Sequence, residues 1–180
     1  MKRSLDISLM KKINEQTAND IIAIHNQESE QEDVFFQNKS GDFLKLYQDL
    51  GIDISAFAAP GTSSLKTWVP VFKNGQTLLS VHNTFISDHD LKFLIEQGPT
   101  GFYFCLCPAA NLYIEKKLPP VADIMRSSEN IILGTDSLAS NSSLSILKEI
   151  KILLQHFSVP VEVVLKWATY NGARALGISD

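Results

Sequence analysis

Two histidines and two carboxylates in this 180-residue chain are the side chains best suited to do chemistry together. His25 and Glu28 lie in "IHNQES", His82 lies in "VHNTF", and Asp136 lies in "LGTDS". Imidazole and carboxylate groups suit zinc or iron(II), and such a metal lowers the pKa of bound water toward neutrality. A further carboxylate nearby can transfer protons. The residue types therefore indicate a hydrolytic metal centre, to which His25, His82 and Asp136 contribute at most three ligands.

Each of these residues also has a structural interpretation. A single histidine near a strand end is more often a hydrogen-bonded structural residue than a metal ligand. Asp136 could simply cap the turn that follows it, and Asn141 could be the N-cap of the next helix. The other histidines, His89 and His156, fall near a predicted helix start and a predicted helix end, and we assign neither a function.

The elements that must position these residues alternate along the chain. Four apolar segments are predicted as strands, at residues 20–26, 76–85, 101–108 and 130–136. Amphipathic patterns predict helices at residues 8–19, 43–51, 63–72, 87–98, 119–128, 144–157 and 160–177. Continuous apolar strands followed by helices predict an α/β fold with a parallel sheet covered on both faces. The carboxyl ends of such strands share one rim, where we also expect Asn111 and Ser137.

Composition restricts the class of protein. The chain is 44% apolar and 20% charged, which is typical of a globular protein, and we expect residues 1–180 to form a single α/β domain. A formal charge of −4 gives no electrostatic basis for binding nucleic acid or an anionic membrane. No apolar run approaches the roughly 20 residues that span a bilayer. The basic start, "MKRSLDISLMKK", is not predicted to be a signal peptide, because Asp6 and two lysines interrupt its apolar residues.

The two cysteines are Cys105 and Cys107, one residue apart in "YFCLCP". On an extended segment they are predicted to point to opposite faces, so that they do not readily form a disulfide. A metal thiolate cluster usually needs two C-x2-C pairs, which the sequence lacks. We therefore expect two buried, reduced thiols, which favours a cytoplasmic location.

Two architectures fit the alternation of strands and helices. One is an open, flavodoxin-like sheet with strand order 2-1-3-4, in which Asp136 would be a strand-end acid for phosphate chemistry. The other is part of a (β/α)8 barrel, for which a whole barrel takes about 250 residues and eight strand–helix units. No G-x-G-x-x-G or P-loop follows any predicted strand, which removes the usual nucleotide-binding interpretation of an open sheet.

Several segments taken in order resemble a known family. The segments are "IHNQESEQE", "SVHNTF", "CPAANLYI", "ILGTDSLASNSSLSILKEI" and "LKWATYNGARALGI". Together they resemble the later half of the metal-dependent amidohydrolase superfamily, in its branch of chlorohydrolases, cytosine deaminases and adenosine-type deaminases. The combination of L-G-T-D-S-x-A-S-N with N-G-A-R-A-L-G is the most specific part of the likeness. The fold that this resemblance implies is a partial (half) TIM-type (β/α)8 barrel.

The resemblance also implies a metal and its ligands. The family holds one divalent metal, zinc or iron, at the strand ends. His25 matches the histidine ligand of the fifth barrel strand, and Asp136 matches the eighth-strand aspartate, which binds the metal and accepts a proton from water. His82 matches the sixth-strand histidine that polarises the attacked centre or orients the water.

The remaining expectations concern the substrate. Glu28 matches the family's glutamate that hydrogen-bonds the substrate and moves a proton to its ring nitrogen. Asn111 and Ser137 are implied neighbours that bind substrate. The expected partner is a small heterocyclic molecule that loses an amino group or a halide, so the resemblance implies a metal-dependent hydrolase.

The sequence departs from the family in ways that favour an alternative. The first-strand H-x-H and strands one to four of the barrel are missing, and Ala109 stands where the family often has a basic residue. The alternative is therefore a catalytically inert fragment or binding module of such an enzyme. A half barrel would expose two unpaired strand edges, so we expect a homo-oligomer that covers them.

Overall fold

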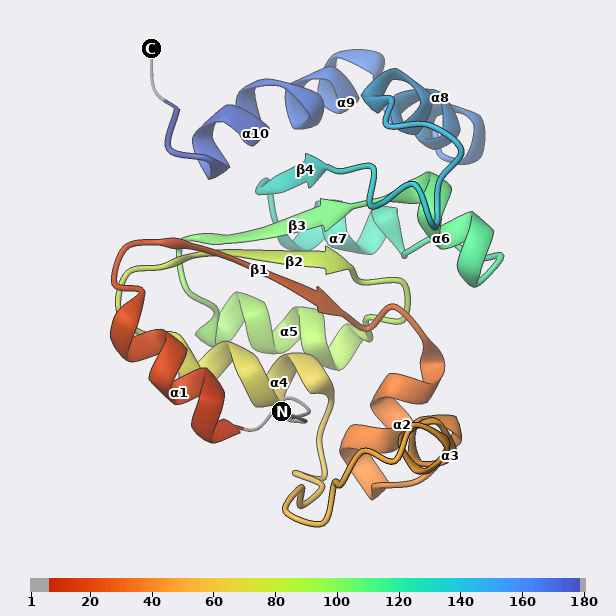
Figure 1. Ribbon diagram of the computed structural model, residues 1–180. Helices are drawn as coiled ribbons and strands as arrows, with labels where there is room; N and C mark the ends of the chain where they lie inside the picture. The colour runs from red at the N-terminus through yellow and green to blue at the C-terminus, as the bar shows by residue number, and fades with distance from the viewer. Residues whose placement is uncertain (1–6, 179–180) are drawn as a thin grey trace.

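The computed structural model describes residues 7–178, and its centre is one sheet of four parallel strands (Figure 1). Residues 1–6, which belong to the segment tested above for a signal peptide, lie outside the described residues. The strands are β1 (Ile21–Asn26), β2 (Thr77–His82), β3 (Phe102–Leu106) and β4 (Ile131–Leu133). All four predicted strand segments are therefore present; β1 ends at the predicted residue, and the other three strands end two or three residues earlier than predicted.

The order of strands in the sheet is β1-β2-β3-β4, the same as their order along the chain. Each neighbouring pair is parallel, with His25 opposite Val81 and Phe104 opposite Ile131 in the register. A flavodoxin-like sheet would instead place its second strand outside its first, so that interpretation is wrong. Successive neighbouring parallel strands joined by helical crossovers are the arrangement of a barrel segment, which confirms the predicted partial (β/α)8 fold.

Helices cover the sheet and flank its β4 end. In Figure 1, α1, α4 and α5 lie below β1 and β2, while α8, α9 and α10 lie beyond β4. The helices are α1 (Ile7–Gln16), α2 (Glu30–Asn38), α3 (Asp42–Asp49), α4 (Ser64–Trp68), α5 (Asp88–Gln97), α6 (Pro108–Ile114), α7 (Val121–Ser127), α8 (Ile146–His156), α9 (Val161–Ala168) and α10 (Tyr170–Ala175). A 3-10 turn, Val69–Val71, extends α4. Within residues 7–178, no helix combines the length and the apolar character needed to cross a bilayer.

The main core lies between the sheet and these helices. Alternate residues of β3, Phe102, Phe104 and Leu106, face it together with Trp68 of α4 and Leu153 of α8. The opposite side chain of β3, Tyr103, packs instead against Ile132 and the α10 residue Ala175. This alternation is the period of two expected of a strand that is buried on both faces.

Helix boundaries were predicted well where capping residues mark them. Ser87, the first residue of the predicted segment 87–98, caps α5 in a reciprocal capping box with Asp90. No helix is predicted for the polar segment at residues 27–42, but the structure has α2 there. The segment at residues 160–177 is two helices, because Thr169 breaks the helical backbone with a ψ of −82°. Asn141 is not the N-cap of α8, which starts at Ile146 after Ser145.

The prediction that Cys105 and Cys107 point to opposite faces is wrong. β3 ends at Leu106, and the backbone of Cys107 turns into α6 with φ −122° and ψ 68°. Residues two apart on an extended segment share a face, and both sulfur atoms lie beside Gly134, where an added Cβ would come within 2.9 Å of Cys105 Sγ and 3.2 Å of Cys107 Sγ. Both thiols are free, and the hydrogen bond between them lowers the pKa of Cys105 and raises the pKa of Cys107.

A buried carboxylate, Asp90, joins α5 to the loop that follows β1. It accepts hydrogen bonds from Ser63 Oγ at 2.5 Å, Ser87 Oγ at 2.7 Å and Gln27 Nε2 at 2.9 Å. Burial raises the pKa of Asp90, but the hydrogen bonds from these three side chains outweigh burial and lower the pKa below its usual value. The ionised carboxylate therefore stabilises the fold next to the carboxyl end of β1.

Replacing Asp90 with asparagine should lower the free energy of unfolding by about 2 kcal/mol near neutral pH, because an amide donor then faces donor groups. Since the folded-state pKa is lowered, the stabilisation by Asp90 is complete above the ordinary aspartate value of 3.8 and is lost as pH falls through the folded value. Urea unfolding at about pH 7 and about pH 3 measures this, with a large difference only at the higher pH. Asp88→Asn, an exposed change on the same helix, is the control. Equal effects of the two substitutions would contradict the interpretation.

Candidate active site

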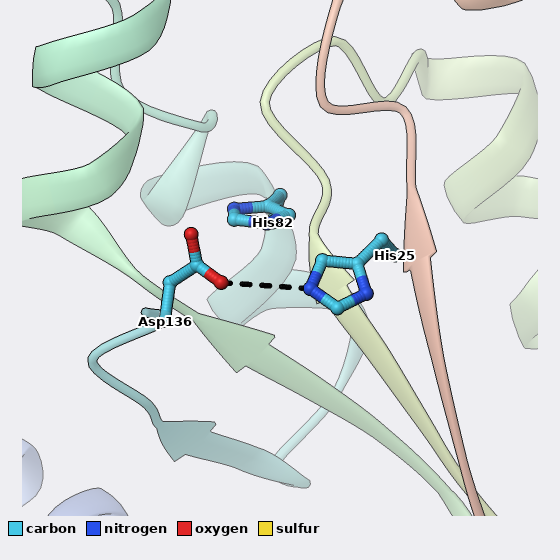
Figure 2. Close-up of side chains that lie close together, drawn as sticks. All are labelled: His25, His82 and Asp136. Atoms are coloured by element: carbon cyan, nitrogen blue, oxygen red, sulfur yellow. Dashed lines mark ion pairs between the residues drawn. The ribbon is translucent and has the colours of Figure 1, made fainter. Parts of the chain in front are cut away.

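Three of the predicted residues come together at the carboxyl end of the sheet. His25 lies near the end of β1, His82 is the last residue of β2, and Asp136 follows β4 (Figure 2). One ligand atom from each lies within 4.8 Å of the others. His25 Nε2 is 3.6 Å from Asp136 Oδ1, and the two imidazole centroids are 5.2 Å apart. Three residues that are far apart in the sequence thus present nitrogen and oxygen donors to one point.

The backbone at these strand ends is unusual. His82, Asn83 and Asp136 have positive φ angles of 76°, 55° and 55°. A non-glycine residue in this region costs roughly 1–3 kcal/mol when the conformation is strained, and such residues concentrate at functional sites. Figure 2 shows the carboxylate of Asp136 directed toward the His25 ring, with the ring of His82 beside them.

His82 is fully buried, and its two ring nitrogens have different environments. Nδ1 lies 2.8 Å from Asn111 Oδ1 and can donate to it, which leaves Nε2 of a neutral ring with a free lone pair. Nε2 has no hydrogen-bond partner among the described residues and lies 3.4 Å from Glu28 Oε1. A buried nitrogen lone pair beside carboxylates is suited to a divalent cation, so the donor set fits a metal.

Asp136 is held as an ionised carboxylate. Partial burial raises its pKa, but hydrogen bonds donated by Ser140 Oγ and by the backbone N–H of Ser137 lower it, and the net pKa lies below the usual aspartate value. An ionised carboxylate is the form that binds a metal and accepts a proton. The chemistry expected of Asp136 is therefore available at neutral pH.

Glu28 and the two expected substrate neighbours have different positions. Glu28 lies in the turn between β1 and α2, and its carboxylate is partly exposed beside His82. Asn111 is fully buried on α6, where its contact is His82. Ser137 is exposed next to Asp136, and its hydroxyl accepts a hydrogen bond from Ala139 N at 3.3 Å.

Sequence reasoning missed several polar residues that support the site. Asn26, at the tip of β1, accepts hydrogen bonds through Oδ1 from Ser64 Oγ and Trp68 Nε1, both at 2.8 Å. Ser140 reaches back to Asp136 from the following turn. Of these residues, only Ser140 had a signal in the sequence, since small and hydroxyl residues follow Asp136. Asn26 and Trp68 have no such signal, because they resemble ordinary strand and helix residues.

A cavity of about 130 Å³ adjoins His25. Ile24 and His25 both line this cavity, although as neighbours they point to opposite faces of β1. The cavity therefore lies along one edge of β1, the edge that pairs with no other described strand. Its other walls are mainly aromatic: Phe35, Phe36, Phe43, Tyr47 and Trp68. The edge of β1 is therefore open next to the proposed metal ligands.

A parallel barrel segment with nitrogen and oxygen donors at its strand ends is an arrangement that could hold a divalent metal ion. Residues 17–180 match the Amidohydrolase family, and the chain belongs to that family. The resemblance inferred from the sequence motifs is thereby confirmed.

Two curated relatives indicate the branch. The 5-methylthioadenosine/S-adenosylhomocysteine deaminase of Pyrococcus abyssi is 33% identical over 111 residues, which cover 57% of this chain and 25% of the relative. The 5'-deoxyadenosine deaminase of Methanosarcina mazei is 34% identical over 111 residues, with the same coverage of 57% and 25%. The match thus takes in about a quarter of the length of these relatives.

Solved structures give the same fold over nearly the whole chain. The aminofutalosine deaminase of Helicobacter pylori aligns with a TM-score of 0.74 and 25% identity, covering 95% of this chain and 42% of that one. An adenosine deaminase from Xanthomonas campestris with bound zinc aligns with a TM-score of 0.65 and 22% identity, covering 98% of this chain and 37% of that one. The second likeness concerns the fold alone.

Proposed function

We propose that this chain supplies metal ligands and proton-transfer groups to a hydrolytic deaminase that acts on an adenine-type nucleoside. The observation that carries the proposal is the convergence of His25, His82 and Asp136, whose ligand atoms lie within 4.8 Å of one another. The relatives are named as deaminases of adenosine-type nucleosides, which favours loss of an amino group over loss of a halide.

The proposed metal ligands are His25 Nε2 and a carboxylate oxygen of Asp136, with His82 Nε2 facing the same point. The unpartnered Nε2 of buried His82 supports this assignment. A bound zinc or iron ion would supply a water molecule whose pKa is lowered toward neutrality. The relative from Xanthomonas campestris with bound zinc supports zinc as the first metal to test.

The side chains of this chain then have distinct proposed functions. Asp136, ionised at neutral pH, takes the proton from the attacking water. Glu28 carries a proton to the ring nitrogen next to the attacked carbon. His82 Nε2 accepts a hydrogen bond from the attacking water and orients it. Asp136 then returns its proton to the amino group, which leaves as ammonia, while the hydroxyl left on the carbon loses its proton to Glu28 and becomes a carbonyl. Asn111 holds His82, and Ser137 is the exposed residue placed to contact substrate.

The open edges of the sheet bear on how the site is completed. β1 and β4 each pair with only one other described strand, and the solved neighbours are more than twice as long as the region they share with this chain. We propose that residues 1–180 form one α/β domain whose edges are covered by further barrel strands or by a second copy of the chain. The free thiols Cys105 and Cys107 support a cytoplasmic location.

Zinc retention and ammonia release together test the proposal. The purified chain is loaded with Zn²⁺ and dialysed against a chelator, and its zinc content is compared with that of His25→Ala. Ammonia release from 5'-deoxyadenosine is then measured with the chain alone and with a first half-barrel of the Methanosarcina mazei relative. Stoichiometric zinc that the variant lacks, with activity on addition of the half-barrel, is the expected result. Zinc content no higher than that of His25→Ala, without activity, would favour the inert-module alternative.

A further inference from the structure

Glu149 of α8 is a fully buried carboxylate that the proposed reaction does not use. None of the ion pairs among residues 7–178 includes it, so no cation compensates its charge directly. Burying a carboxylate is costly unless strong hydrogen bonds replace its hydration. The partners of Glu149 therefore show what this charge does.

The two oxygens of Glu149 accept hydrogen bonds from two different parts of the site. Oε2 accepts from the backbone N–H of Ala109 at 2.7 Å, and Oε1 accepts from Asn141 Nδ2 at 2.8 Å. Ala109 lies in the first turn of α6, and Asn141 lies in the loop after β4. A single side chain thus joins the segment after β3 to the segment after β4.

The α6 side of this connection leads to His82. Ala109 and Asn111 share the first two turns of α6, so holding the N–H of Ala109 fixes the start of the helix that carries Asn111. Asn111 Oδ1 in turn lies 2.8 Å from His82 Nδ1. Glu149 thereby determines where the partner of the His82 ring lies.

The loop side leads to Asp136. Asn141 Nδ2 donates to Thr135 O at 2.9 Å as well as to Glu149, so both amide hydrogens of Asn141 are used. Thr135 directly precedes Asp136, whose backbone is left-handed, and Ser140, which donates to the Asp136 carboxylate, directly precedes Asn141. The amide of Asn141 therefore anchors both ends of the turn that holds Asp136.

We propose that Glu149 is a positioning residue that sets the spacing between His82 and Asp136. Both of its partners are donors, one of them a backbone N–H, so the position requires an acceptor on each oxygen. Glutamine has nearly the same shape but only one acceptor oxygen, and its NH₂ group would face a donor. The proposal rests on the proposed metal site, which Glu149 does not touch.

The first test uses the metal-free chain and compares Glu149→Gln with Glu162→Gln, an exposed change of the same charge on α9. In amide NMR spectra, Glu149→Gln should shift the resonances of both Asp136 and His82 and speed hydrogen exchange of Ala109 at least about tenfold. The exchange of Leu78, near the start of β2, should be unchanged. Glu162→Gln should reproduce none of these effects.

The second test uses Co²⁺ alone as the probe, titrated at a temperature well below unfolding of every variant. Glu149→Gln should raise the dissociation constant for Co²⁺ by about 10-fold and change the visible absorption bands of the bound Co²⁺. A loss of this size is typical when a residue that orients metal ligands is replaced. Asn141→Ala should weaken binding similarly, and the double variant should be no worse than either single one, because the two residues act as a unit.

Two results would overturn the proposal. One is a Glu149→Gln variant with unaltered Asp136 and His82 resonances, and the other is unaltered Co²⁺ affinity combined with only a lower unfolding temperature. If the wild-type chain binds no Co²⁺, the proposed metal site fails, and the metal-free spectra alone decide whether Glu149 holds the two segments. The two failures are thereby distinguished.

Discussion

Replacing Asp136 with alanine should reduce the affinity of the chain for Zn²⁺ by more than about 100-fold, which exceeds the effect typical of losing a residue outside the ligand set. Asp136 is the only anionic member of the three-residue donor group, and its lowered pKa means that its charge is present at neutral pH. Without it, two imidazoles remain, of which His25 is largely exposed and able to move. Calorimetric titration with Zn²⁺ measures the loss.

The matched control is Asp42→Ala, which removes an exposed carboxylate on α3. This variant should bind Zn²⁺ as the wild-type chain does, and both variants should keep the wild-type circular dichroism spectrum. Wild-type affinity in Asp136→Ala would show that zinc binds elsewhere on the chain, and the assignment of Asp136 as a ligand would be wrong.

Replacing Glu28 with glutamine should lower the deamination rate constant kcat of a completed barrel by about 10²–10⁴-fold, the usual contribution of a positioned acid–base group. Zinc content should stay the same, because Glu28 is not one of the three residues whose ligand atoms converge. Its carboxylate lies 3.4 Å from His82 Nε2, at the rim where the ring nitrogen of a substrate would be protonated. Ammonia release and zinc analysis on the same sample separate the two effects.

Glu30→Gln is the control, since Glu30 is an exposed acid two residues further along the chain. It should leave kcat within about twofold of the wild type. If Glu28→Gln were as active as Glu30→Gln, proton transfer would have to be assigned to another residue, and the proposed division of labour between Glu28 and Asp136 would fail.

The positions of the main site residues could be predicted because a simple rule governs them. His25 and His82 lie at the carboxyl ends of apolar strands and Asp136 follows one, and the carboxyl ends of parallel strands meet at one rim. Composition and periodicity also predicted the four strands and most helices. The choice between an open sheet and a barrel segment could not be made from those patterns, because strand order is a property of long-range pairing.

Other features depended on contacts that no local pattern records. Glu149 occupies an ordinary position in an amphipathic helix, and only tertiary packing shows that it is buried and bonded to Ala109 and Asn141. Cys105 and Cys107 were misplaced for a different reason: residues two apart on a strand share a face, and both side chains lie beside Gly134. α2 was missed because its sequence is rich in acidic residues and has little apolar periodicity.

The central claim is that His25 and Asp136 hold one divalent metal ion, which His82 Nε2 faces. Anomalous diffraction at the zinc absorption edge, from crystals of this chain grown with Zn²⁺, tests it most directly. The predicted result is one strong peak between His25 Nε2 and the carboxylate of Asp136, at about 2.0–2.2 Å from each bound atom and facing His82 Nε2. Crystals that contain zinc but show no peak at this position would contradict the claim.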